Sequence, residues 1–282
     1  MTGSLASLRS LLFTPATRPD RIGKGHAAGA DAVIVDLEDG VGIGDKGAAR
    51  DAFATWARTG SPSGPVLLRL NHIATAEGLD DLVFLRDLDV TPTAFMLPKV
   101  ESAEEVRLAA AHLPPGAVLV ALIESARGLH AAPAIAQAPG VAALAFGGAD
   151  LAADLGAALS WEPMLLARSA LVAAAAQGGR LCWDVPCLDI RDATGLARET
   201  RQARALGFSA KMAIHPDQVK TINQAFTPTA DDIARARRIA DAFTAARGGA
   251  CSLDGKMIDR PVVRAAERIL ALAGRDHAKE TT

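Results

Sequence analysis

The sequence predicts an α/β fold, a TIM (β/α)8 barrel followed by a C-terminal helical extension. Three observations predict it. Short apolar runs alternate with longer helical patterns, there are eight such runs, and the alternation ends at residue 226. A stretch of roughly 225 residues is the usual size of this barrel. A doubly wound open sheet remains the alternative, because it shows the same alternation.

The predicted strands are short, and each is bounded by residues that favour turns or helix starts. Because they are almost wholly apolar, we expect them to be buried on both faces, as in a parallel sheet. They span residues 10–14, 32–36, 66–70, 94–97, 119–123, 142–146, 181–185 and 210–214.

Helices are expected between these strands, and their ends carry recognisable signals. Ser102 is followed by Glu105 at the spacing of a capping box, which predicts a helix start there. Gly178–Gly179 and Gly207 follow helical patterns at the position of a C-terminal cap, and Pro216 suits a first helical turn. The predicted helices include residues 102–112, 163–177, 194–206 and 216–226.

The chain after residue 226 exceeds what a barrel needs. A helix over 228–247 is followed by a polar, glycine-containing loop over 250–261 and a second helix over 262–274. We therefore divide the chain into a barrel domain, 1–226, and a segment, 227–282, interpreted as a lid or an oligomerisation arm.

Composition restricts the partners. Thirty Lys and Arg residues against 32 Asp and Glu give a net charge of −2, so nucleic acid and anionic membranes are not expected partners. Small molecules are the expected partners. The chain has no apolar run long enough to span a membrane, and its N-terminus does not resemble a signal peptide. Three sparse cysteines are expected to be reduced thiols, so a cytoplasmic location is predicted.

Two carboxylates each follow an apolar strand. Glu124 ends one, and Asp150 comes 26 residues later, after the next. This spacing is about one strand–helix–strand unit, which places both groups at the C-terminal edge where barrel enzymes bind ligands. Buried carboxylates need a neutralising partner, and Mg²⁺ prefers such hard oxygen ligands. The alternative is that each carboxylate caps a helix or pairs with an arginine.

Basic residues follow other strands. A guanidinium at Arg69 is suited to holding a carboxylate in a bidentate fork, although an ion pair with Asp36, Glu38 or Asp39 would explain it equally. Near strand one, a phosphate site is possible at Arg18, Arg21 and Lys24. A solvated helix face would look the same.

Lys99 and His215 also end strands. A Schiff-base role for Lys99 has no support from its neighbours, which give no sign of an apolar pocket. His215 precedes a proline and is more typical of a hydrogen bond to the backbone or a substrate than of a metal ligand.

Several motifs occur in a fixed order over nearly the whole chain, from about Leu8 to Ala273. They are LRSLLFTP at 8–15, DAVIVDLEDGV at 31–41, RLN at 69–71, LPKVES at 97–102, LIE at 122–124, FGGAD at 146–150, KMAIHP at 211–216 and LDGKMID at 253–259. With these motifs the chain resembles the citrate lyase β-subunit-like proteins of the HpcH/HpaI aldolase superfamily, in its acyl-CoA lyase branch.

The resemblance implies an enzyme that cleaves or forms a carbon–carbon bond next to a thioester with Mg²⁺. It implies that Glu124 and Asp150 hold the metal and that Arg69 grips the carboxylate of the keto-acid half. Asp259 matches the catalytic acid/base, on a tail that closes over a neighbouring subunit in trimers. Arg69 and Asp259 are thus the expected catalytic residues. The expected substrate-binding residues are Arg69, Glu124, Phe13, Arg18 and Lys24, the last three contacting coenzyme A.

The expected substrate is a 3-hydroxyacyl-CoA such as malyl-CoA or citramalyl-CoA, split into acetyl-CoA and a 2-keto acid by a homotrimer or higher homo-oligomer. A malyl-CoA thioesterase, or a citrate lyase β subunit acting on an acyl-carrier thioester, shares the same motifs. A non-catalytic CoA-binding protein and an aldolase for free acids are further alternatives. The presence of both metal carboxylates, Arg69 and Asp259 argues against the non-catalytic protein. The set of Phe13, Arg18 and Lys24, with the tail that carries Asp259, favours coenzyme A over free acids.

Overall fold

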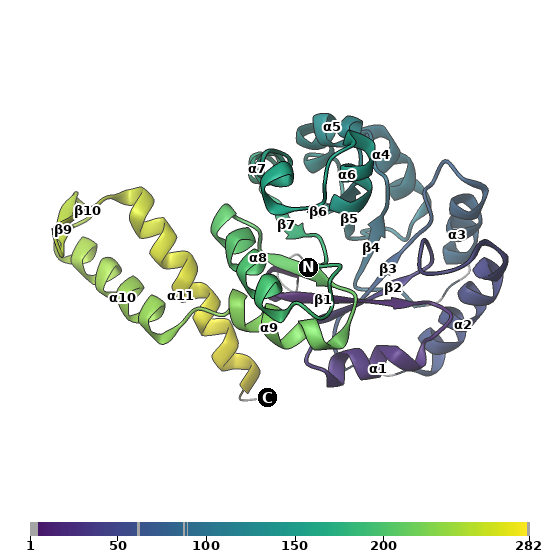
Figure 1. Cartoon of the computed structure of the whole chain (residues 1–282), viewed down its shortest axis with the longest axis horizontal. Coiled ribbons are helices and arrows are strands. Elements are labelled where there is room, and N and C mark those ends of the chain that lie inside the picture. Colours follow the sequence, from purple (N-terminus) through teal and green to yellow (C-terminus); the bar gives the residue numbers. More distant parts are fainter. Residues whose placement is uncertain (1–4, 61–62, 87, 89, 281–282) are drawn as a thin grey trace. The chain divides into compact units, whose positions relative to one another are not determined.

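The eight predicted strands form one closed parallel barrel in the computed structural model of the chain. The structure describes residues 5–60, 63–86, 88 and 90–280, so the first four residues of the N-terminal segment lie outside it. The chain divides into two compact units, Met1–Gln224 and Ala225–Thr282. Figure 1 shows the barrel strands of the first unit surrounded by its helices.

The strands and helices of the first unit alternate along the chain. Two 3₁₀ turns, Leu5–Ser7 and Ile43–Asp45, accompany them. In order, the elements are β1 Ser10–Pro15, α1 Asp20–Ala27, β2 Ala32–Asp36, α2 Lys46–Thr59, β3 Val66–Arg69, α3 Ala76–Arg86, β4 Ala94–Leu97, α4 Ala103–His112, β5 Leu119–Ile123, α5 Ala126–Ala136, β6 Val141–Phe146, α6 Gly148–Leu155, α7 Trp161–Gly178, β7 Leu181–Asp184, α8 Ala193–Leu206, β8 Ala210–Ala213 and α9 Pro216–Phe226.

The barrel prediction is confirmed, and the open-sheet alternative is wrong, because β1 pairs in parallel with both β2 and β8. The predicted strand ends are within one residue of the observed ones. The barrel has two apolar layers. Its interior is filled by side chains that include Leu67, Met96 and Trp183, and a second layer lies between the strands and the helices. The barrel is therefore a packed core whose mouth is left for chemistry.

The capping box expected at Ser102 is only half formed. The Ser102 hydroxyl accepts a hydrogen bond from the Glu105 amide, as predicted. The Glu105 carboxylate, however, accepts from the amide of Glu101 and not from that of Ser102. A complete capping box occurs instead at the start of α10 (Ala230–Ala245), between Thr229 and Asp232.

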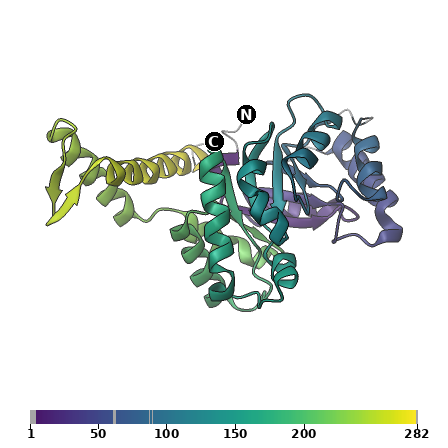
Figure 2. The same cartoon turned by 90° about the horizontal axis from the view of Figure 1, so that it is seen from above.

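The second unit contains two helices and a short hairpin. After α10, the antiparallel strands β9 (Cys251–Leu253) and β10 (Lys256–Ile258) lead into α11 (Arg260–Glu280). Figure 2 shows the hairpin at one end of the helix pair. We expected a loop where the hairpin forms. Strands of three residues give too little alternation to be recognised, although Asp254–Gly255 is a typical hairpin turn.

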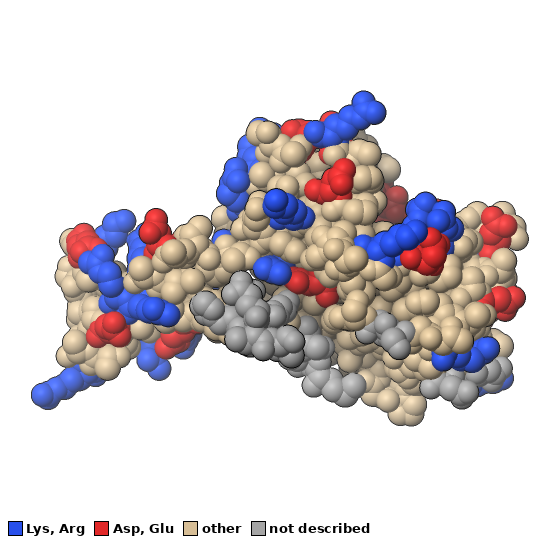
Figure 3. Space-filling model, turned by 90° about the horizontal axis from the view of Figure 1, so that it is seen from below, with Lys and Arg blue, Asp and Glu red and all other residues tan. Residues whose placement is uncertain are grey.

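All three cysteines are free, which agrees with the expectation of reduced thiols. The described residues contain no helix that is both long and apolar enough to cross a membrane. Acidic and basic side chains are interspersed over the face shown in Figure 3, in keeping with the nearly balanced composition.

A buried charge cluster ties β7 and β8 to the helices outside them. Asp184 accepts hydrogen bonds from Lys211 at 2.6 Å and from Arg168 at 3.0 Å, and its side chain is fully buried. Lys211 also contacts Glu199 of α8 at 2.7 Å. Burial opposes ionisation of Asp184, but the two adjacent cations outweigh it and lower its pKa.

We predict that Asp184→Asn destabilises the barrel by about 3 kcal/mol, because it leaves two buried cations short of a counter-charge. Urea unfolding followed by tryptophan fluorescence measures the loss. Asp254→Asn, which breaks an exposed pair with Arg238, is the control and should cost under about 1 kcal/mol. Since the Asp184 pKa is lowered in the folded state, the wild-type advantage should persist above about pH 4 and fall below it. Equal stabilities of the two variants would contradict this role.

Candidate active site

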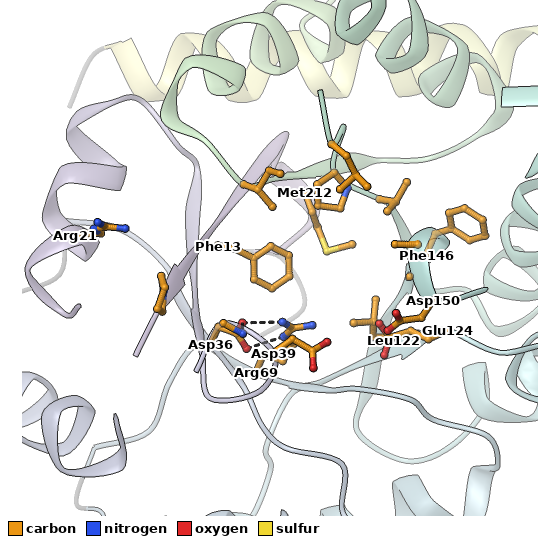
Figure 4. Close-up of a pocket in the computed structure, with 18 residues that line it drawn as sticks. Phe13, Arg21, Asp36, Asp39, Arg69, Leu122, Glu124, Phe146, Asp150 and Met212 are labelled. Atoms are coloured by element: carbon orange, nitrogen blue, oxygen red, sulfur yellow. Dashed lines mark hydrogen bonds and ion pairs between the residues drawn. The ribbon is translucent and has the colours of Figure 1, made fainter. Parts of the chain in front are cut away.

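A cavity of about 490 Å³ opens at the C-terminal ends of the barrel strands. Its acidic side chains are Asp36 at the end of β2, Asp39 in the loop that follows, Glu124 just after β5 and Asp150 in α6, and its apolar side chains come from β1, β5, β6, β8 and the loop after β7. Figure 4 shows Arg21 on the β1 side and Glu124 with Asp150 on the opposite side. The lining of the cavity includes Phe13, Arg21, Asp36, Asp39, Arg69, Glu124, Phe146, Asp150, Val185, Leu188 and Met212.

Arg69 is held by a bidentate pair with Asp36. The two residues lie opposite each other in the β2–β3 ladder, and Nε and Nη2 of Arg69 each donate to Asp36 at 2.7 Å. The guanidinium carbon lies 4.8 Å from the centre of the Phe13 ring. Burial opposes the charge of Arg69, but its contacts with Asp36 and Glu38 raise its pKa above the ordinary value. The ion-pair alternative stated for Arg69 is therefore realised.

Asp36 also shapes the loop that follows β2. Its carboxylate accepts hydrogen bonds from the amides of Glu38 and Gly40, both at 2.9 Å. A Cβ on Gly40 would lie 2.5 Å from Asp36 Oδ2, so only glycine permits this approach. The turn brings Glu38 back toward the barrel axis, where an oxygen of its buried carboxylate lies 2.9 Å from Arg69 Nη1. That contact is an ion pair without hydrogen-bond geometry.

Lys99 lies among four carboxylates. Its ammonium donates to Glu38 and lies 3.5 Å from Asp39 and 3.9 Å from Asp150. Burial would lower the pKa of this lysine, but the hydrogen bond with Glu38 and the neighbouring charges raise it. A Schiff-base lysine needs the opposite shift, so the structure agrees with setting that role aside.

Glu124 is oriented by the backbone around it. Its Oε2 accepts a 2.8 Å hydrogen bond from the Lys99 amide, and a Cβ on Gly147 would lie 2.1 Å from its Cγ. It does not cap the following helix, because Ser125 does so by accepting from the Gly128 amide. Burial, and after it the charge of Glu38, raise the pKa of Glu124 to about 8.

Asp150 lies in the first turn of α6, where the helix dipole favours a negative charge. Its side chain makes no capping hydrogen bond there and is 47% exposed. Figure 4 shows its carboxylate beside that of Glu124 at the edge of the cavity. The two predicted strand-end carboxylates therefore do come together.

The acidic part of the site carries more negative than positive charge. Asp36, Glu38, Asp39, Glu124 and Asp150 are five carboxylates, and Arg69 and Lys99 are two cations, so full ionisation leaves three negative charges in excess. Among the described residues, no group of three or more His, Cys, Asp or Glu side chains is arranged to hold a metal ion. Two carboxylates with open positions for water and substrate oxygens suit Mg²⁺, which keeps several non-protein ligands.

Much of the remaining lining is apolar. Figure 4 shows the Met212 and Phe146 side chains around the cavity and Phe13 near its middle. Val185 and Leu188, from the loop after β7, complete this apolar lining. A lining that combines acidic and apolar side chains suits a ligand that has a polar, metal-binding end and an aliphatic body.

A second cavity of about 400 Å³ adjoins the first through shared lining residues, Phe13 and Arg21. Arg18 and Lys24 line it and are exposed, each paired with Asp20 at 2.9 Å and 3.0 Å. The hydrogen bond from Arg18 is the main reason that the pKa of Asp20 is lowered. His215 lines this cavity too, and its Nδ1 accepts from the Asp217 amide at 3.3 Å.

Asp259 belongs to the second unit, where it has a local structural role. It stands immediately before α11, and its Oδ1 accepts a 3.3 Å hydrogen bond from the Val262 amide. An aspartate at this position is a favourable N-cap. The structure thus places Phe13, Arg69, Glu124 and Asp150 around one cavity, Arg18 and Lys24 in the adjoining one, and Asp259 in a separate unit.

Lys99 is the site residue whose importance the sequence did not reveal. We weighed it only as a Schiff-base candidate, whereas it contacts Glu38, Asp39, Asp150 and Glu124. The run of three acidic residues at 36–39 was a usable signal, because so many carboxylates at one barrel mouth require a nearby cation. The apolar lining gave no signal of its own, since Met212 and Val185 resemble ordinary strand residues.

A closed barrel with an acidic, ligand-sized cavity at its C-terminal mouth defines a TIM-barrel enzyme. The model of the HpcH/HpaI aldolase/citrate lyase family matches residues 9–216, and that of the carbon–carbon bond lyases of the TIM-barrel fold matches residues 172–275. The chain belongs to the HpcH/HpaI aldolase/citrate lyase family and is a carbon–carbon lyase.

Named relatives cover nearly the whole chain. A citrate lyase subunit β-like protein of Mycobacterium tuberculosis is 39% identical, over 93% of this chain and 94% of that protein. Human mitochondrial citramalyl-CoA lyase is 31% identical, over 94% and 85%. A (3S)-malyl-CoA thioesterase of Cereibacter sphaeroides is 33% identical, over 94% of each.

A solved structure of a similar protein has the same fold. The CitE protein of Mycobacterium tuberculosis, in complex with magnesium, acetoacetate and coenzyme A, is 38% identical to this chain. The two align with a TM-score of 0.83, over 95% of this chain and 99% of that one.

We predict that ionisation of Glu124 destabilises the protein when no divalent cation is present. Because its pKa is raised to about 8 from an ordinary value near 4.3, its contribution to stability is complete in acid and is lost as pH rises toward 8. The loss is at most about 1.4 kcal/mol per pH unit. Melting temperatures of the wild type and Glu124→Gln, measured in a chelator from pH 5 to pH 9, should diverge in favour of the variant. Parallel profiles would contradict the raised pKa.

Proposed function

We propose that the protein is a Mg²⁺-dependent lyase that cleaves, or in reverse forms, a 3-hydroxyacyl-CoA such as malyl-CoA or citramalyl-CoA. The products of cleavage are acetyl-CoA and a 2-keto acid. The single observation that carries the proposal is the excess of carboxylates, Glu124 and Asp150 included, in a cavity bordered by Arg69. Two of the relatives are named for such thioesters, a citramalyl-CoA lyase and a malyl-CoA thioesterase, and CitE is seen with magnesium, acetoacetate and coenzyme A.

Glu124 and Asp150 are the proposed metal ligands. Glu124 is buried with one oxygen held by the Lys99 amide, which leaves its other oxygen available to a cation. The raised pKa of Glu124 shows that its ionised form is poorly stabilised in the metal-free protein, and a nearby positive charge would stabilise it. Mg²⁺ bound there would act as a Lewis acid toward the oxygens of the hydroxy-acid or keto-acid half.

Arg69 is proposed to bind the carboxylate of the keto-acid half. A guanidinium has five N–H donors, and Asp36 uses two of them, so donors remain for a substrate. The pair with Asp36 fixes the plane of the fork before substrate arrives, which reduces the entropic cost of orientation.

Phe13, Arg18 and Lys24 are proposed to contact coenzyme A. They line the cavity next to the acidic one, and Phe13 belongs to both. This arrangement suits a thioester that places its phosphates near Arg18 and Lys24 and its acyl group beyond Phe13. The cations are exposed, and within the part of the chain that the structure describes they pair with Asp20 alone, so a phosphate group can compete for them.

Asp259 is proposed as the acid/base. In the cleavage direction it takes the proton of the substrate hydroxyl while the carbon–carbon bond breaks. The electron pair of that bond then forms the thioester enolate, and the same proton is returned to its carbon. An ordinary Asp is a weak base, and exclusion of water around bound substrate would raise its pKa into a useful range.

The second unit, which contains Asp259, is also part of the proposal. We propose that the second unit closes over the site of a neighbouring copy in a homo-oligomer, as a trimer, and that the protein is cytoplasmic. The near-neutral composition and the free cysteines support the latter.

A thioesterase is the second candidate, favoured by the 33% identity to the malyl-CoA thioesterase. Water in place of the enolate chemistry would release free coenzyme A with the hydroxy acid intact. The third is a citrate lyase β subunit that takes its thioester from an acyl-carrier protein.

An assay of the purified protein with Mg²⁺ and malyl-, citramalyl- or hydroxymethylglutaryl-CoA tests the proposal. We expect acetyl-CoA and a keto acid in equal amounts, measured separately from free coenzyme A by chromatography. Free coenzyme A with an intact hydroxy acid would establish the thioesterase instead. No release from any substrate would refute both and favour the carrier-protein subunit.

We predict that Asp259→Asn lowers kcat by at least about a hundredfold, since it removes the proposed proton acceptor. Asn is as good an N-cap as Asp, so the melting temperature and Mg²⁺ affinity should stay unchanged. Asp259→Ala is the matched comparison and should lose about 1 kcal/mol of stability along with activity. Near-normal turnover by Asp259→Asn would remove this residue from the mechanism.

A further inference from the structure

Lys99 has a left-handed backbone, with φ of +53°. Among the described non-glycine residues of the barrel unit it is the one with a positive φ. A side chain in this conformation costs of order 1 kcal/mol, so the fold must hold it there. In this conformation its N–H donates to Glu124 at 2.8 Å.

The side chain of Lys99 approaches the same group of acids by a different route. Its ammonium donates to Glu38, contacts Asp39, and lies 3.9 Å from Asp150. Through its two ends, Lys99 therefore contacts both proposed metal ligands, Glu124 by the backbone and Asp150 by charge. Lys99 therefore contacts residues of three segments: the loop after β2, the end of β5 and the first turn of α6.

We propose that Lys99 is a positioning residue and a tethered counter-ion, whose ammonium shares the Asp150 carboxylate with the metal and thereby limits metal affinity in the absence of substrate. This inference rests on the proposed function, because it takes Glu124 and Asp150 as the metal ligands. It adds a residue that neither binds the metal nor reacts.

Lys99 acts through its charge. Two cations that share one carboxylate repel each other, so the ammonium disfavours a divalent ion there. The same ammonium reduces the acidic excess of these groups from four charges to three, and this favours an anionic keto acid. Removing it should therefore strengthen the metal and weaken the keto acid, a pair of opposite changes that damage to the fold would not produce.

The test is Mg²⁺ titration calorimetry of the full chain. Lys99→Gly removes the ammonium, keeps the N–H and tolerates the left-handed backbone; Lys99→Met keeps the volume. Both should bind Mg²⁺ about tenfold more tightly, because a charge a few ångströms from a divalent ion has this effect even with water-like screening. With Mg²⁺ saturating, both should bind pyruvate several-fold more weakly.

Two controls isolate the cause. Lys99→Arg keeps the charge and should restore wild-type Mg²⁺ affinity. Arg107→Met removes an equal charge from the exposed face of α4, outside both cavities, and should change neither affinity. Melting curves show which variants are folded, and Lys99→Met serves if Lys99→Gly is not.

The outcomes separate this inference from the proposed function. Wild type that binds Mg²⁺, with Lys99→Gly and Lys99→Met binding it no more tightly, would overturn the role of Lys99 alone. Tighter binding by Lys99→Arg as well would also overturn it, because charge would not be the cause. Absence of Mg²⁺ binding by the wild type and by both Lys99→Gly and Lys99→Met would overturn the proposed metal site together with this inference.

Discussion

The pair between Asp36 and Arg69 is the interaction on which the rest of the site depends. The β2–β3 register sets the two residues opposite each other, so their contact follows from the barrel itself. Asp36 uses its remaining capacity to hold the amides of Glu38 and Gly40. The loop that this creates delivers Glu38 to Lys99, and Lys99 in turn holds Glu124. Arg69 is thus fixed before any substrate binds.

The order in which these contacts follow one another explains what the sequence could and could not predict. Strand ends were predictable because apolar runs stop where the mouth begins, and the side chains just beyond them gather there in any parallel barrel. Partners were not predictable, since they depend on register and on backbone torsion. The pair between Arg69 and Asp36 depends on the β2–β3 register, and the sequence does not reveal the left-handed backbone of Lys99.

Local signals failed where tertiary contacts competed with them. Glu105 has the spacing of a capping box, yet its carboxylate accepts from Glu101, one residue beyond the expected donor. Glu101 itself accepts from Ser125 at the start of α5, so this turn is shared between two helices. The same competition decided Glu124: Ser125 caps α5, and Glu124 is left facing the cavity. When a neighbouring residue caps the helix, a polar side chain at the same strand end can face the cavity instead.

The acid/base proposed in the second unit is positioned in a different way from the proposed metal ligands. Glu124 and Asp150 depend on contacts among distant parts of the barrel, whereas Asp259 is placed by its own helix, through the amide of Val262. Its carboxylate therefore keeps its orientation on α11 whatever the second unit contacts. A capping carboxylate still has one oxygen outside the hydrogen bond, and proton transfer needs only one. The proposed proton acceptor therefore keeps its geometry on α11 with or without bound substrate, which lowers the entropic cost of orienting it for proton transfer.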